Sequence, residues 1–103
     1  MTELDKLEQY LKDNKIKYER YDVTRSWESD DLTYLMDRHQ ICVPQDGEGC
    51  LWDAICQHGS YGYEDGLIEI YGCIVPDNVG DSVEGFLTAQ DVIERINAYE
   101  RFH

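Results

Sequence analysis

Apolar residues near the N-terminus recur with the spacing of an α-helix. Leu4, Leu7 and Leu11 form one stripe along a helical surface. Thr2 and Asp5 have the spacing of a capping box, in which each side chain accepts a hydrogen bond from a backbone N–H group of the first turn. The pattern therefore predicts an N-terminal helix.

The C-terminal part of the chain repeats this arrangement. Thr88 and Asp91 have capping-box spacing, and Val92, Ile93 and Ile96 follow on one helical face. A second helix is therefore predicted near the C-terminus.

Two stretches in the middle also have helical spacing. Ser29 is a good N-cap for a helix over 29–39, because Asp30 and Asp31 follow it in the first turn, where the helix dipole favours acids. A short helix is predicted over 51–56, with Gly59 able to end it.

Three stretches have the composition or alternation of strands. Residues 16–23 mix aromatic and β-branched residues with charges, 41–43 form a short apolar run before Pro44, and 67–75 alternate in hydrophobicity. We therefore expect an α+β fold: a small two-layer sandwich of about three strands and three to four helices. Residues 1–103 are predicted to form a single domain.

The same periodicities predict which side chains form the hydrophobic core. The predicted core residues are Leu7, Leu11, Leu35, Val43, Trp52, Ile55, Ile68, Ile70, Ile74, Val92 and Ile96.

The distribution of charge narrows the choice of partners. The formal net charge is −13, and no lysine or arginine occurs between Arg38 and Arg95, a stretch with eleven acidic residues. Such a field repels nucleic acid and anionic membranes and attracts basic partners. We therefore expect a basic protein surface as partner, with no direct binding of nucleic acid or membrane. Alternatively, the acidic charge serves only to keep the protein soluble. A homo-oligomer is compatible with the sequence.

The lack of a membrane-spanning run and of a signal-peptide pattern predicts a cytoplasmic protein. No apolar run approaches the roughly 20 residues that span a bilayer, and the acidic N-terminus is unlike a signal peptide. In the cytoplasm, the four cysteines are expected to be reduced thiols: Cys42, Cys50, Cys56 and Cys73.

No motif indicates a metal, a cofactor or a catalytic group. The cysteines lack the paired spacing of a zinc site. Cys56 and His58 are two residues apart and would not face each other on a helix, and an acid such as Asp53 would raise the pKa of the thiol. We therefore predict no metal, cofactor or catalytic residues and lean against an enzyme.

The glycine-rich segment 59–66 contains the candidate contact residues. It lacks the lysine of a phosphate-binding loop, and its acids would repel phosphate. Tyr61 and Tyr63, with neighbouring Glu64 and Asp65, are the candidate contacts for a protein partner, because tyrosine is enriched at interfaces. Alternatively, the tyrosines pack on the sheet and the glycines supply a turn with positive φ.

Three functions remain open from these observations. The first is a non-enzymatic acidic protein-interaction module. The second is a nucleic-acid-mimicking inhibitor of a DNA- or RNA-binding protein. The third is a small enzyme or metabolite-binding protein, which would need a pocket with convergent polar groups.

Several segments resemble a group of small uncharacterised bacterial and prophage-encoded proteins. The resemblance covers roughly the C-terminal two thirds, in the segments 51–56, 59–63, 66–69 and 84–89. It implies a bacterial or phage accessory protein. No activity is assigned to that group, so the resemblance transfers no functional residue.

Overall fold

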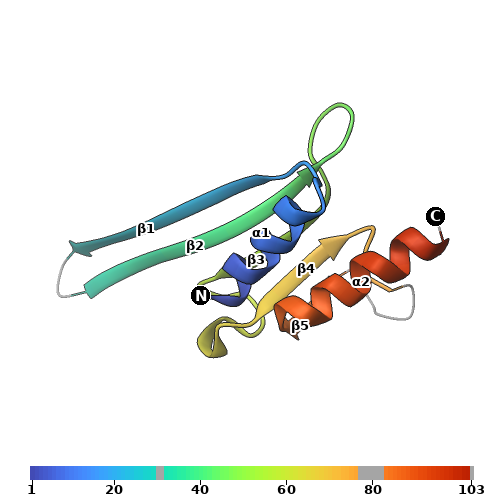
Figure 1. Cartoon of the computed structure of the whole chain (residues 1–103). Helices are drawn as coiled ribbons and strands as arrows, with labels where there is room; N and C mark the ends of the chain where they lie inside the picture. Colours follow the sequence, from blue (N-terminus) through green and yellow to red (C-terminus); the bar gives the residue numbers. More distant parts are fainter. Residues whose placement is uncertain (30–31, 77–82, 103) are drawn as a thin grey trace.

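A five-stranded antiparallel sheet with the strand order β1-β2-β3-β4-β5 forms the centre of the molecule (Figure 1). The computed structural model describes residues 1–29, 32–76 and 83–102. The strands are β1 (Glu19–Ser29), β2 (Leu32–Pro44), β3 (Cys50–Gln57), β4 (Ile68–Gly72) and β5 (Val83–Leu87). The helices are α1 (Glu3–Asp13), the short 3-10 helix η1 (Tyr63–Asp65) and α2 (Ala89–Phe102).

Both terminal helices form as their capping patterns predict. The backbone N–H groups of Thr2 and Asp5 each donate to the other residue's side chain over 3.0 Å. Thr88 and Asp91 exchange the equivalent bonds over 3.0 and 3.2 Å. These bonds satisfy N–H groups that otherwise lack partners at the start of a helix.

The predicted fold is wrong in its elements, although the α+β class holds. Residues 32–39 belong to strand β2 and residues 51–56 to strand β3, in place of the two predicted helices. Strand β5 was not predicted, while Asp30 and Asp31 lie outside the described residues. Strand pairing on both sides of β2 and β3 outweighs the weak helical spacing, because sheet neighbours determine strand formation more than local propensity does.

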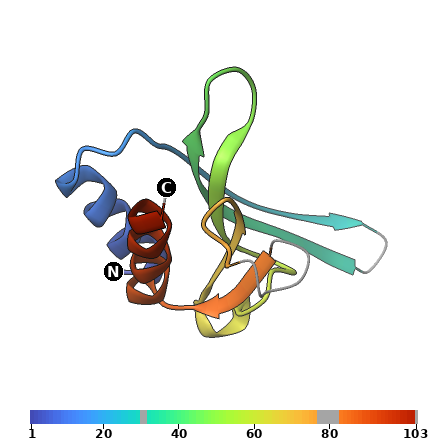
Figure 2. The ribbon, with the colours of Figure 1, turned by 90° about the vertical axis from the view of Figure 1, so that its right-hand side faces the viewer.

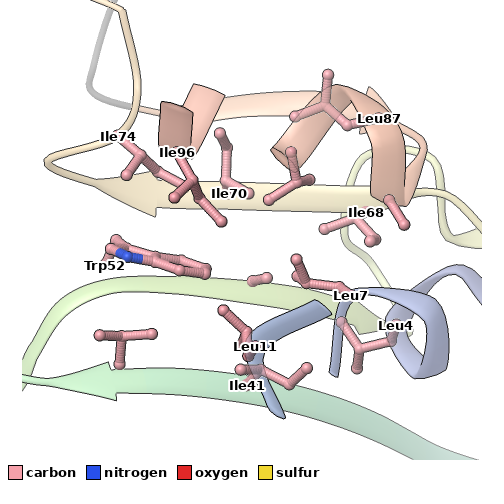
Figure 3. Packing of buried hydrophobic residues seen from close by; sticks show 14 of the residues in the cluster. Leu4, Leu7, Leu11, Ile41, Trp52, Ile68, Ile70, Ile74, Leu87 and Ile96 are labelled. Carbon is pink, nitrogen blue, oxygen red and sulfur yellow. The ribbon is translucent and has the colours of Figure 1, made fainter. Parts of the chain in front are cut away.

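Helices α1 and α2 cover one face of the sheet and bury a hydrophobic cluster of described residues (Figures 2 and 3). Nine predicted core residues are buried there: Leu7, Leu11, Val43, Trp52, Ile68, Ile70, Ile74, Val92 and Ile96. The prediction that Ile55 is a core residue is wrong. It is only partly buried, because a strand places residues 52 and 55 on opposite faces, where a helix would place them together. The side chain of Leu35 lies outside the described part of the structure.

The prediction of four reduced thiols is also wrong. Cys42 of β2 and Cys50 of β3 form a disulfide, whereas Cys56 and Cys73 are free. Pairing of the two strands brings the Cα atoms of Cys42 and Cys50 to 5.6 Å, a separation that suits a disulfide. Separately, none of the helices in the described ranges is long and apolar enough to cross a membrane.

The first hairpin extends beyond the rest of the sheet (Figure 1). β1 and β2 pair from Glu19↔Cys42 to Ser29↔Leu32, whereas β3 pairs with β2 only from Arg38 onward. On the helix-covered face, Asp22, His39 and Cys56 are aligned across β1, β2 and β3. This alignment places polar side chains beside the apolar core.

Candidate functional site

The loop 58–66 lies between β3 and β4, and its residues 58–65 line a cavity of about 580 Å³ together with Phe86. Ser60 fixes its start, since the Ser60 hydroxyl donates to the Gln57 carbonyl over 2.7 Å and accepts from the Gln57 N–H over 3.0 Å. Gly62 and Gly66 flank η1 with φ values of +95° and +72°, which a glycine adopts without strain. The loop therefore has a defined, hydrogen-bonded shape.

Two exposed aromatic rings lie side by side on this surface. The ring centroids of Tyr61 and Phe86 are 6.2 Å apart, and both residues remain about three-fifths exposed, at 62% and 61%. The Phe86 N–H donates to the Tyr61 carbonyl over 3.3 Å, so the backbones of loop and strand are joined here. The pair forms a small aromatic surface in contact with solvent.

A β-bulge in β5 determines where Phe86 points. Ile68 pairs with Leu87 and Ile70 with Glu84, so β5 has one extra residue in this interval. Phe86 has a φ of +59°, which is unusual and strained for a bulky side chain. A Cβ at Gly85 would lie 2.4 Å from the Cβ of Tyr61, so glycine is needed at that position. Bulges that redirect a side chain are frequent near functional sites.

Two acidic residues, Glu64 and Asp65, line the same cavity as the two rings. Glu64 and Asp65 are exposed on η1, and the Tyr61 N–H donates to the Glu69 carboxylate over 3.3 Å. We call Tyr61, Glu64, Asp65 and Phe86 the acid–aromatic patch. Three of these four residues belong to the candidate set predicted from sequence.

Tyr63, the remaining candidate, has a different position. It is only partly exposed, and its hydroxyl donates to Asp37 of β2 over 2.5 Å. Phe86 was missed by sequence reasoning. The available signal was Gly85 directly before the apolar pair Phe86 and Leu87, since a glycine within a strand often marks a bulge.

A second concave region lies between α1 and strands β1 to β3. This groove has a volume of about 580 Å³ and is lined mainly by polar residues. Its central cation is Arg20, which donates to Asp5 over 2.9 Å, to Glu8 over 3.2 Å and to Asp22 over 3.1 Å. Arg20 therefore ties β1 to α1 by ion pairs.

His39 bridges two carboxylates at the edge of this groove. Its Nδ1 lies 2.7 Å from Asp22 of β1, and its Nε2 lies 2.7 Å from Asp37 of β2. These bonds, the one to Asp22 foremost, raise the pKa of His39 against the opposing effect of burial. The pKa of Asp37 is lowered, chiefly by the hydrogen bond from Tyr63.

The arrangement around Cys56 does not suit nucleophilic catalysis. Cys56 pairs directly with His39 across the strands, but both ring nitrogens of His39 already face carboxylates. Burial raises the pKa of the Cys56 thiol, and Asp37 adds to that effect. A thiolate is the reactive form, so this environment opposes its formation. Asp53, three residues earlier in the strand, points to the opposite face.

Comparison of the chain with protein-family models, with curated proteins and with solved structures finds no match.

Proposed function

We propose that this protein is a non-enzymatic interaction module that binds a basic surface of another protein through the acid–aromatic patch. The observation that carries the proposal is Phe86. A bulged strand holds this ring in solvent beside Tyr61, at a strained φ of +59°. Strain of this kind persists only where the surrounding structure imposes it, and it concentrates at functional sites.

Charge supports a basic partner. The net charge is −13, and Glu64 and Asp65 lie exposed beside the rings. Opposite charges speed the encounter of two proteins, and burial of aromatic rings then slows dissociation. The patch combines both elements within one loop and its neighbouring strand.

The two alternatives have less support from the described residues. A nucleic-acid mimic would use the same negative charge, but an exposed aromatic pair is not part of phosphate mimicry. A small enzyme would use the groove, where His39 has no free ring nitrogen and the Cys56 pKa is raised.

The test begins with affinity capture from the native host. The immobilised protein is compared with a double charge reversal in the patch, Glu64→Lys with Asp65→Lys. The matched control is Asp46→Lys with Glu48→Lys, which changes the net charge equally on an exposed loop at the other end of β3. The association rate of the captured partner is then measured by surface plasmon resonance at several salt concentrations.

The patch reversal is expected to slow association by on the order of tenfold at low salt, while the control changes it much less. Tyr61→Ala should mainly speed dissociation, whereas Tyr71→Ala, an exposed tyrosine on β4, should not. Equal effects of the two charge reversals would show that total charge, and not the patch, drives binding. A partner that DNA displaces competitively would favour the mimic.

A further inference from the structure

His39 joins two strands through both of its ring nitrogens. Each nitrogen lies 2.7 Å from a carboxylate oxygen, one on Asp22 and one on Asp37. A neutral imidazole has a single N–H, and its other nitrogen presents a lone pair, which a carboxylate oxygen would repel. Because ionised carboxylates only accept hydrogen bonds, this geometry favours the doubly protonated imidazolium.

Asp37 connects this imidazolium to the loop 58–66. One Asp37 oxygen faces His39 and also accepts from the Thr24 hydroxyl over 3.0 Å. The other Asp37 oxygen accepts from the Tyr63 hydroxyl over 2.5 Å. Tyr63 is the first residue of η1, and the exposed acids of the patch, Glu64 and Asp65, are the other two. The position of Asp37 is thus coupled to that of the patch.

We propose that His39 is a proton-operated clamp that holds the acid–aromatic patch in its binding conformation. With the proton bound, His39 fixes Asp37, and Asp37 fixes the loop through Tyr63. Loss of the proton leaves a lone pair facing one of the two carboxylates, so that the clamp opens and the loop loosens. The regulatory role rests on the proposed function of the patch, whereas the clamp itself is a property of the isolated chain.

The surroundings of His39 favour the charged form. Asp22 and Asp37 contact the ring directly, Cys56 of β3 lies opposite it, and Tyr63 reaches it through Asp37. Behind Asp22 stands Arg20, whose positive charge opposes that of the imidazolium but is shared among Asp5, Glu8 and Asp22. The net result is a raised His39 pKa, so the clamp opens on the alkaline side.

The clamp is tested on the free protein by two nuclear magnetic resonance measurements. Ring ¹⁵N shifts report the protonation of His39 as pH rises. Amide hydrogen exchange reports the loop at residues 63, 65 and 66 and at the adjacent residue 67, whose N–H groups all donate to backbone carbonyls of the loop. Tyr63→Phe removes the hydroxyl that joins loop to clamp, and Tyr61→Phe is the matched control.

We expect His39 to titrate above 6.5, the usual value for histidine. Across that titration, loop exchange should accelerate on the order of tenfold beyond its intrinsic pH dependence, the change that loss of about one hydrogen bond gives. Tyr63→Phe should loosen the loop at every pH and abolish the step, and Tyr61→Phe should keep the step.

Two results would overturn the clamp: a neutral His39 ring at pH 6, or loop exchange that shows no step where His39 titrates. Neither result depends on a partner. A failed binding experiment therefore tests the proposed function alone, and a failed exchange experiment tests the clamp alone.

Discussion

The left-handed backbone conformation of Phe86 predicts that glycine at this position gives a more stable protein than alanine. Alanine normally stabilises a protein relative to glycine by about 0.5–1 kcal/mol, because glycine loses more backbone freedom on folding. At a positive φ of +59°, however, a Cβ costs roughly 1–2 kcal/mol that glycine does not incur. Phe86→Gly should therefore be more stable than Phe86→Ala, by about 0.5–1 kcal/mol after the two effects offset each other.

Comparison of the two variants isolates the backbone effect. Both lack the ring, so both lose the contact with Tyr61, and this loss cancels in the difference. Urea unfolding measures the free energies of unfolding. Heating should show a Tm for the glycine variant that is roughly 2–5 °C higher. Both variants should bind the partner equally weakly, because both remove the exposed ring.

Tyr71 supplies the control for this comparison. It is also an exposed aromatic residue in a strand, at 58%, and it is not among the described residues with positive φ. At that position alanine should be more stable than glycine. If Phe86→Ala equals or exceeds Phe86→Gly in stability, the bulge does not impose the left-handed conformation, and the strain argument for the patch fails.

Three further predictions concern the whole fold. The pKa of His39 is raised in the folded state, so the protonated ring stabilises the fold fully below the unfolded pKa of about 6.5, and this stabilisation is lost as pH rises through the folded pKa. The free energy of unfolding, measured with urea from pH 6 to 9, should show this decline, and His39→Gln should remove it. Leu7→Ala should destabilise by about 2–5 kcal/mol, since Leu7 is fully buried, whereas a loss under about 1 kcal/mol in urea would argue against this core. Reduction of Cys42–Cys50 should cost roughly 2–3 kcal/mol for so short a loop, and unchanged calorimetric unfolding with reductant would contradict that disulfide.

The sequence alone determined the elements whose signals are local. Both capping boxes predicted their helices, because the hydrogen bonds of a helix start lie within four residues. The alternation around Ile68 and Ile70 predicted β4. Most of the predicted core is buried, since an apolar side chain at a periodic position gains by leaving water in any compact arrangement.

Strands β2 and β3 were decided only by the tertiary structure. Their apolar spacing satisfies a helix over a few residues, and pairing with neighbours distant in sequence made them strands. Because these segments are strands and not helices, their side chains alternate between the two faces of the sheet, and Ile55 lies outside the buried core.

The candidate site shows the same division. The loop with Tyr61, Glu64 and Asp65 was visible in the sequence as glycine-rich, acidic and aromatic. Phe86 belongs to the acid–aromatic patch because a bulge in β5 places it there. Tyr63 does not belong to the patch, because its hydroxyl binds Asp37. The register of strand pairing brings together residues that are far apart in the chain. A local sequence pattern does not show which residues will become neighbours in this way.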